Sequence, residues 1–337
     1  MKAAVIEERE RIKIKELPAP DLRAHEVLIK VKACGVCGTD IHIYKGEFPV
    51  KYPIVPGHEF SGIVEEVGEE VRSVRPGDRV TVDPNISCGK CYYCRTGRAN
   101  FCENWQALGV TLPGGYAEYV KAPEGNVYKV PEGLTFEEAA FAEPVSCVVH
   151  GLKRARVRLG DTVAIFGLGP IGLIHLQLVK KLGATLVVGI DLIEDKLRLG
   201  ERLGADHVVD ASREDVVEEV KKVTGGRGVD LAIEASGNLK AFQQALRCLD
   251  YGGRLLVFGV APQSSVVQVA PFEIYRREVS VLGSFINPYT TKCALDVIAS
   301  GSVNIKALIS KVYRLEEVSA AFKSVEEGRA VKVMLRP

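Results

Sequence analysis

The spacing of apolar and polar residues changes near residue 160 and divides the chain into two parts. In the first 150 residues, short runs such as 25–36, 60–68 and 76–82 alternate apolar with polar positions and are separated by Gly and Pro. This alternation predicts strands with one solvated face, arranged as an antiparallel, barrel-like sheet.

Beyond residue 160, buried strands alternate with amphipathic helices. Residues 161–167 read as a strand, 170–184 as a helix that ends at a glycine, and 186–191 as the next strand. Strand and helix continue to alternate to about residue 261, and a further helix is expected over 291–301. Repeated strand–helix–strand units predict a parallel sheet, so the fold class is α/β with a β-rich domain in front.

Composition narrows the possible functions. The chain is 47% hydrophobic and 26% charged, with a net charge of +1, which argues against nucleic acid or an anionic membrane as partner. The N-terminal residues carry charges where a secretory signal needs an apolar stretch, and no apolar run is long enough to span a membrane. The expected location is therefore the cytoplasm.

A glycine-rich turn lies between the first strand and helix of the second part. Gly167, Gly169 and Gly172 have G-x-G-x-x-G spacing, which permits a tight turn, lets the backbone approach a pyrophosphate and allows helix and strand to pack closely. Asp191 ends the next strand about 20 residues later, where a carboxylate binds the adenosine ribose and repels a 2′-phosphate. The pattern predicts a dinucleotide site that favours NAD. The alternatives are that Asp191 caps the next helix, and that Lys196 is a solvated helix charge and makes no contact with the ribose.

Four cysteines indicate a closed metal site. They can surround zinc tetrahedrally and leave no position for substrate, so the site is structural, although an iron–sulfur cluster is the alternative. The four residues are Cys88, Cys91, Cys94 and Cys102.

A catalytic zinc needs three protein ligands and an open position. Cys37, His58 and Glu59 are the candidates. Singly, each is also typical of an inert buried cysteine, a hydrogen-bonded histidine or a chance match. Their joint occurrence beside a dinucleotide domain favours the metal.

Together these motifs resemble the zinc-dependent medium-chain alcohol dehydrogenases along essentially the whole chain. They are "CGTDIH", "GHE", the four-cysteine loop, "AEP" at 142–144 and "GLGPIG" followed by Asp191. The resemblance implies a GroES-like catalytic domain, residues 1–150 completed by 288–337, and a Rossmann NAD-binding domain, 151–287. It also implies one catalytic and one structural zinc, with Glu143 as a further ligand or as a partner of the metal-bound water.

The resemblance further implies a proton path. Thr39 would pass on the substrate proton, His42 would deliver it to solvent, and Asp40 would orient the zinc-bound imidazole. Zinc would lower the pKa of the alcohol, and hydride would pass to the nicotinamide. Without the resemblance, Thr39 and Asp40 are an ordinary loop hydroxyl and turn carboxylate. The implied cofactor contacts are Gly167, Gly169, Pro170, Ile171, Gly172, Asp191, Lys196, Phe258, Gly259, Val260, Ser284 and Phe285.

The implied substrate is a small secondary alcohol. The "AEP" motif is similar to the polyol and threonine dehydrogenase branches, so a polyol or polyol phosphate is expected and L-threonine is the alternative. Ile43 and Ile286 replace residues usual in sorbitol-type enzymes, which favours a related polyol over sorbitol. The candidates for the substrate pocket are Tyr44, Glu143 and Asn287.

Two other classes compete with the zinc dehydrogenase. One is a zinc-free quinone or enoyl reductase of the same fold, against which Cys37, His58 and Glu59 argue. The other is a non-catalytic zinc- or dinucleotide-binding protein, which the near-neutral charge and the lack of a basic stripe argue against as a nucleic-acid binder. The resemblance also implies a homo-oligomer, a tetramer or a dimer.

Overall fold

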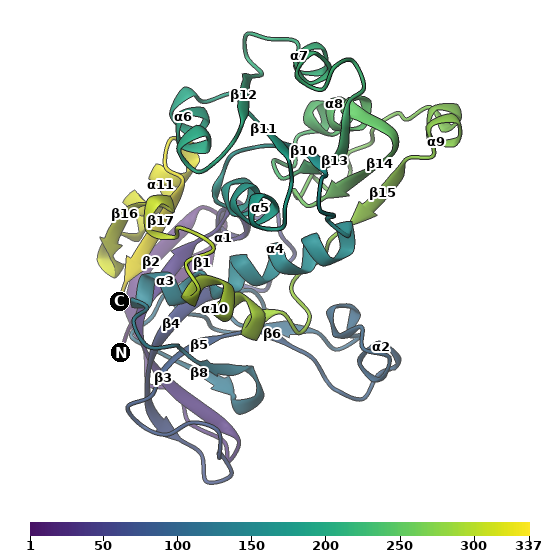
Figure 1. Cartoon of the computed structure of the whole chain (residues 1–337). Coiled ribbons are helices and arrows are strands. Elements are labelled where there is room, and N and C mark those ends of the chain that lie inside the picture. Colours follow the sequence, from purple (N-terminus) through teal and green to yellow (C-terminus); the bar gives the residue numbers. More distant parts are fainter. The chain divides into compact units, whose positions relative to one another are not determined.

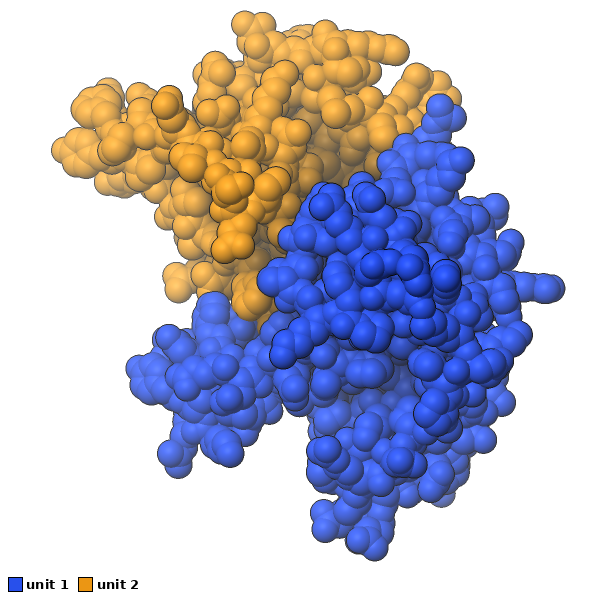
Figure 2. All heavy atoms as spheres, turned by 180° about the vertical axis from the view of Figure 1, so that it is seen from behind, with its two compact units in different colours: residues 1–146, 287–301, 305–337 blue, residues 147–286, 302–304 orange.

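The computed structural model describes residues 1–337 and divides them into two compact units, coloured separately in Figure 2. Unit 1 comprises residues 1–146, 287–301 and 305–337, and unit 2 comprises 147–286 and 302–304. The predicted α/β class, with a β-rich part and a parallel-sheet part, is confirmed. None of the helices has the length and apolar character needed to cross a lipid bilayer.

Unit 2 is built on a six-stranded parallel sheet in the order β12-β11-β10-β13-β14-β15 (Figure 1). Its strands are β10 (Thr162–Phe166), β11 (Leu186–Asp191), β12 (His207–Asp210), β13 (Val229–Glu234), β14 (Leu249–Val257) and β15 (Ser280–Gly283). Its connecting helices are α5 (Pro170–Lys181), α6 (Glu194–Arg202), α7 (Val216–Val223), α8 (Leu239–Cys248) and α9 (Pro271–Arg277). The strand order reverses between β10 and β13, and in such sheets ligands bind beyond the carboxyl ends of the strands at this point.

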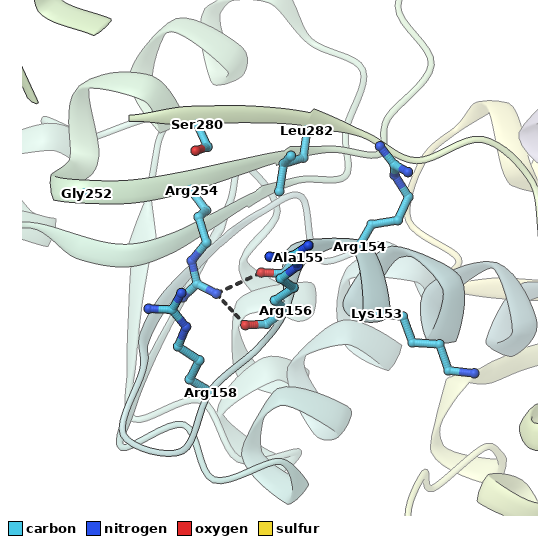
Figure 3. A pocket seen from close by; sticks show the side chains of 9 residues that line it. All are labelled: Lys153, Arg154, Ala155, Arg156, Arg158, Gly252, Arg254, Ser280 and Leu282. Atoms are coloured by element: carbon cyan, nitrogen blue, oxygen red, sulfur yellow. Dashed lines mark hydrogen bonds between the residues drawn. The ribbon is translucent and has the colours of Figure 1, made fainter. Parts of the chain in front are cut away.

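A buried arginine joins two parts of unit 2. Helix α4 (Ala142–Ala155) ends with carbonyl groups that have no partner within the helix. Arg254 of β14 donates to the carbonyl oxygens of Ala155 at 2.7 Å and Arg156 at 2.5 Å (Figure 3), and to Asp161 Oδ2 at 2.7 Å. Its guanidinium therefore caps the helix and pairs with a buried carboxylate. Around it lies a cavity of about 520 Å³ whose lining includes Lys153, Arg154, Arg156, Arg158 and Arg254.

Unit 1 is built on a seven-stranded sheet in the order β16-β17-β3-β4-β5-β9, with β8 also paired to β3. All its pairs are antiparallel except β16 with β17, which are parallel. The strands are β3 (Glu26–Val36), β4 (Glu59–Val67), β5 (Arg79–Val82), β8 (Tyr119–Pro123), β9 (Val127–Lys129), β16 (Ile309–Arg314) and β17 (Lys332–Arg336). The remaining strands of the unit are β1 (Lys2–Glu8), β2 (Arg11–Glu16), β6 (Asn85–Ile86) and β7 (Gln106–Ala107).

Short helices and a large apolar core complete unit 1. Phe60, Tyr116 and Phe322 are fully or almost fully buried in this core, which packs between the sheet, the β1–β2 hairpin and the C-terminal segment. The helices of the unit, apart from α4, are α1 (Gly38–Tyr44), α2 (Tyr92–Arg95), α3 (Phe136–Ala140), α10 (Thr291–Ala299) and α11 (Val318–Glu326). Helix α10 corresponds to the helix predicted over 291–301, whereas α1 was not predicted because it is short and lacks a long apolar period.

Candidate active site

The three candidate ligands of the catalytic zinc meet where β3 ends and β4 begins. Cys37 follows β3 directly, His58 precedes β4, and Glu59 is its first residue. The antiparallel register pairs Gly35 with Glu59, which places these two strand ends side by side. The ligand atoms of the three residues lie within 4.8 Å of one another. The structure thus brings together the three residues that sequence analysis selected.

A glycine opposite Glu59 makes room for its carboxylate. A Cβ atom built on Gly35 would lie 2.1 Å from Glu59 Oε2 and 2.9 Å from Lys332 Cε. Both distances are too short for real Cβ contacts, so any side chain at Gly35 would displace the carboxylate. The absence of a side chain at this position is therefore part of the site.

The chemistry of the three side chains fits a metal ion at this point. The ligand atoms of Cys37, His58 and Glu59 are grouped within 4.8 Å of one another. His58 and Glu59 are both buried. A Cys, His and carboxylate donor set suits zinc, and three protein ligands leave a tetrahedral position open.

Asp40 organises the loop that carries Cys37. Its fully buried carboxylate accepts hydrogen bonds from Cys37 N at 2.8 Å, Tyr116 Oη at 2.8 Å and Gly57 N at 3.3 Å. Burial by itself raises the pKa of Asp40, but His58 and these donors outweigh it, so the pKa is lowered. Asp40 Oδ1 lies 3.5 Å from His58 Nδ1, longer than a good hydrogen bond. The carboxylate therefore faces the imidazole, as expected of a residue that orients a zinc ligand.

Sequence analysis missed a buried lysine at the site. Lys332, the first residue of β17, places its ammonium 2.7 Å from Glu59 Oε1, and both side chains are almost completely buried. Burial opposes the charged form, but Glu59 and Cys37 outweigh it and raise the pKa of Lys332. The available signal was a lysine directly before three apolar residues at the start of the C-terminal strand.

The two residues of the expected proton path lie on α1. Thr39 Oγ1 is 3.8 Å from Cys37 Sγ. His42 is half exposed, and its Nδ1 lies 2.6 Å from Glu47 Oε2. Thr39 is therefore next to a candidate ligand and His42 is open to solvent, while their roles in proton transfer stay predictions.

The three candidate residues of the substrate pocket, Tyr44, Glu143 and Asn287, differ in burial and in hydrogen-bond partners. Glu143 is buried in the first turn of α4, and its carboxylate is not among the ligand atoms grouped at the metal site. Tyr44 donates its hydroxyl to the Glu10 carbonyl oxygen at 2.9 Å. Asn287 is 1% exposed. Its amide binds Asn85 at 2.7 Å and Thr291 at 3.3 Å, which occupies it in the protein interior.

The four-cysteine loop forms the second cluster. The sulfur atoms of Cys88, Cys91, Cys94 and Cys102 lie within 4.8 Å of one another. The N–H groups of Lys90 and Cys91 donate to Cys88 and lower the pKa of its thiol to about 6, which favours the thiolate that binds metal. Burial, followed by hydrogen bonds with Cys91 and Cys102, raises the pKa of Cys94 to about 11. Four sulfur atoms in this arrangement could close the tetrahedral coordination sphere of a structural zinc.

The glycine-rich turn has the geometry that its spacing predicts. Gly167 has a φ of +94°, which L side chains rarely adopt, and a Cβ on Gly172 would lie 1.8 Å from the Gly167 carbonyl oxygen. A Cβ on Gly169 would meet nothing within 4 Å, so the turn is open on that side. Gly169 is also the N-cap of α5, which starts with Pro170, and the free N–H groups at such a helix N-terminus suit a phosphate. The open turn at the helix N-terminus fits a dinucleotide.

Asp191 lies beside this turn. Its carboxylate accepts hydrogen bonds from Leu168 N at 2.7 Å, Leu192 N at 2.8 Å and Ile193 N at 3.0 Å. One of these bonds reaches the glycine turn and two reach the start of the α6 region, where Lys196 also lies. The other expected cofactor contacts, 258–260 and 284–285, directly follow β14 and β15. All of them share the carboxyl edge of the parallel sheet, where ligands of this fold bind.

The fold and the two cysteine-containing clusters define a zinc-binding dehydrogenase with a nicotinamide cofactor. Two families match the sequence, the "Alcohol dehydrogenase GroES-like domain" over residues 23–132 and "Zinc-binding dehydrogenase" over residues 170–300. The chain belongs to the zinc-dependent medium-chain alcohol dehydrogenase family. The predicted GroES-like and Rossmann folds, the zinc and the nicotinamide cofactor are thereby confirmed.

Similar proteins include several polyol dehydrogenases. The chain is 37% identical to a sorbitol dehydrogenase of Bacillus subtilis (100% of this chain, 97% of the relative) and 39% identical to a D-arabitol-phosphate dehydrogenase of Enterococcus avium (95% and 92%). Chains named L-threonine 3-dehydrogenase from two Bacillus species are 36% and 37% identical. The solved structure of a zinc-binding dehydrogenase of Sinorhizobium meliloti bound to NADP matches with a TM-score of 0.97 and 41% identity (100% and 99%).

Proposed function

We propose that this chain oxidises a secondary hydroxyl group of a polyol or polyol phosphate, with NAD as the hydride acceptor. The observation that carries the proposal is the cluster of Cys37, His58 and Glu59, whose ligand atoms lie within 4.8 Å of one another. A zinc-free reductase would have no use for this donor set. The names of the polyol dehydrogenase relatives support the substrate class.

Each residue of the site has a separate role in the proposed reaction. Cys37, His58 and Glu59 would hold zinc, which when bound would supply Lewis acidity for the alcohol oxygen, and NAD would supply the hydride acceptor. Asp40 fixes the backbone N–H of Cys37 and faces the imidazole of His58. Thr39 accepts the substrate proton, and His42, paired with Glu47 at the surface, returns it to solvent.

The preference for NAD rests on Asp191. Its carboxylate lies against the N–H of Leu168 in the glycine turn, where a negative charge repels the 2′-phosphate of NADP. The relative from Sinorhizobium meliloti was found with NADP, so the preference needs a direct test. We expect a lower KM for NAD than for NADP, and a smaller difference in an Asp191→Gly variant. A wild-type preference for NADP would contradict the role given to Asp191.

The substrate can be found by an NADH-formation screen over polyols, their phosphates, L-threonine and simple secondary alcohols. We expect the highest kcat/KM with a polyol or its phosphate. The highest value with L-threonine would establish the alternative function instead. Cys37→Ser is expected to lose one zinc per chain and its activity, while the matched control Cys293→Ser keeps both, because Cys293 belongs to neither cluster. Full activity after loss of the Cys37 zinc would refute zinc catalysis.

Two further expectations belong to the proposal. A homo-oligomer, a dimer or tetramer, is supported by exposed aromatic side chains on α9, Phe272 at 64% and Tyr275 at 79%. A cytoplasmic location is supported by the cysteines grouped at the two candidate metal sites, because clustered cysteines are typical of metal binding in a reducing compartment. Light scattering of the purified protein measures the oligomeric state, and a monomer would contradict the expected homo-oligomer. Fractionation of the source cells tests the cytoplasmic location.

A further inference from the structure

The cavity beside Arg254 is lined by basic side chains and lies on one face of the unit 2 sheet. Its volume is about 520 Å³, within the range of pockets that hold small molecules. The register pairs Arg254 of β14 with Ser280 of β15, and Leu282 lies two residues further along the same face. The end of α4 and the loop before β10 supply the other basic residues of the lining (Figure 3), which are Lys153, Arg154, Arg156 and Arg158. No acidic side chain is among the lining residues.

Only one of the five cations at this basic cavity is balanced by a carboxylate, because Arg254 pairs with Asp161. Arg154 donates from Nε to the carbonyl oxygen of Gly283 at 2.5 Å, which is a neutral acceptor. The side chains at the other three positions are exposed and form no ion pair, and they are Lys153, Arg156 and Arg158. Four positive charges therefore remain unbalanced around the cavity.

The end of helix α4 explains only part of this charge. Cations in the last turn of a helix are stabilised by its dipole, which accounts for Lys153 and Arg154. The carbonyl groups of Ala155 and Arg156 already accept hydrogen bonds from Arg254. The side chains of the loop beyond the helix add further like charges, which repel those of the last turn. Stabilisation of the helix therefore does not account for a cavity with this lining.

Arg156 also occupies a backbone position that favours glycine. Its φ is +51°, in the left-handed region, where a Cβ atom is unfavourable. Residues with this conformation after a helix are usually glycines, and those after α5, α6 and α7 of the same unit are Gly183, Gly204 and Gly225. Glu278 after α9 is the other exception. The chain thus keeps a cationic side chain at the cavity where glycine would suit the backbone better.

We propose that the basic cavity binds a diphosphate group, either as the free anion or as part of a nucleotide. A phosphate group carries a charge of about −1.5 to −2 at neutral pH, so two linked groups match the unbalanced cations. The guanidinium groups of Arg156 and Arg158 suit phosphate oxygens, because each can donate two parallel N–H bonds. None of the lining residues is an expected cofactor contact, so the site is additional to the cofactor site and does not depend on the proposed function.

The test titrates the holoenzyme with inorganic pyrophosphate in a calorimeter, with NADH at saturation so that the glycine turn is occupied. We expect saturable binding with a Kd below about 1 mM, and weaker binding of inorganic phosphate. Arg158→Gln should weaken pyrophosphate binding at least about 5-fold, because charge-assisted hydrogen bonds are lost. The matched control is Arg247→Gln, which removes an exposed arginine from the last turn of α8, outside the cavity, and should leave the affinity unchanged.

Arg156→Gly separates anion binding from a role in folding. Glycine relieves the left-handed backbone, so the Tm should stay equal or rise, while pyrophosphate affinity falls at least about 5-fold. Unchanged affinity in either cavity variant, or an equal loss in Arg247→Gln, would overturn the proposal. Wild type that shows no saturable binding, or that binds phosphate as tightly as pyrophosphate, would overturn it as well. ADP under the same conditions distinguishes the two sources, because tighter binding than pyrophosphate supports a nucleotide and equal or weaker binding supports the free anion.

Discussion

Replacing His175 by leucine is expected to stabilise unit 2, and to do so more strongly in acid. His175 lies in α5, directly behind the glycine turn, and is fully buried. Neither ring nitrogen has a hydrogen-bond partner, and the ring meets Phe258 edge-on with centroids 4.9 Å apart. Burial lowers the pKa of His175 to about 3, so the folded protein holds the ring neutral.

The size of the effect follows from these surroundings. A buried polar group without a partner costs about 1–3 kcal/mol, and the aromatic contact returns about 0.5–1.5 kcal/mol. Leucine has a similar volume and no polar atom, so a net gain of about 1–2 kcal/mol is expected at neutral pH. Below pH 6.5 His175 becomes protonated in the unfolded protein, whereas in the folded protein it stays neutral down to about pH 3. Wild type therefore loses stability as the pH falls through this window, about 2 kcal/mol by about pH 5 and roughly 5 kcal/mol in total.

Urea unfolding followed by circular dichroism, at about pH 7.5 and pH 5, measures the difference between the variant and wild type. The advantage of His175→Leu should grow by about 2 kcal/mol between the two conditions. The matched control is His207→Leu, because His207 is exposed at the start of β12 and should give no such growth. The reasoning is refuted if the leucine variant is less stable at both pH values, or if its advantage is independent of pH.

Three further substitutions test other parts of the molecule. Gly35→Ala places a Cβ 2.1 Å from Glu59 Oε2 and should weaken binding of the Cys37 zinc by about 10–100-fold, measured by chelator competition. An unchanged zinc affinity would show that the Glu59 carboxylate can move aside without loss of metal binding. Arg254→Met leaves the buried Asp161 without a cation and should lower the free energy of unfolding by about 3–5 kcal/mol in denaturant titration, whereas a loss below about 1 kcal/mol would mean that the pair is dispensable. Cys94→Ser should remove one zinc per chain and lower the Tm while NAD binding persists, and retention of both zinc ions would exclude the four-sulfur site.

Local spacing predicted the parts of the protein whose chemistry is contained in a short segment. The turn from Gly167 to Gly172 needs its glycines because of contacts within that turn, so their spacing reveals it. The loop from Cys88 to Cys102 likewise holds all four sulfur atoms of its cluster. The glycine turn and the cysteine loop could therefore be predicted from the sequence. The parallel sheet could be predicted as well, because the alternation of strands and helices is also a local pattern.

Contacts between distant residues could not be predicted in this way. Lys332 and Glu59 are separated by 273 positions and share no motif, so only the pairing of β17 with β3 brings them near each other. The contact of Asn287 with Asn85, about 200 positions away, has no signal in the sequence either, while the place of Asn287 in a substrate pocket stays a prediction. Side-chain direction in such cases depends on tertiary packing, which neither periodicity nor spacing records.

The place of β17 in the sheet also determines when Glu59 can meet its ammonium partner during synthesis. This strand lies between β16 and β3, yet it comprises residues 332–336 and follows every other strand in the sequence. Cys37, His58 and Glu59 leave the ribosome long before it, and unit 2 has its whole parallel sheet before Lys332 is translated. A nascent chain thus carries the three candidate zinc ligands before the ammonium that contacts Glu59 has been made. Glu59 can acquire this partner only after β17 has been translated and has paired with β3.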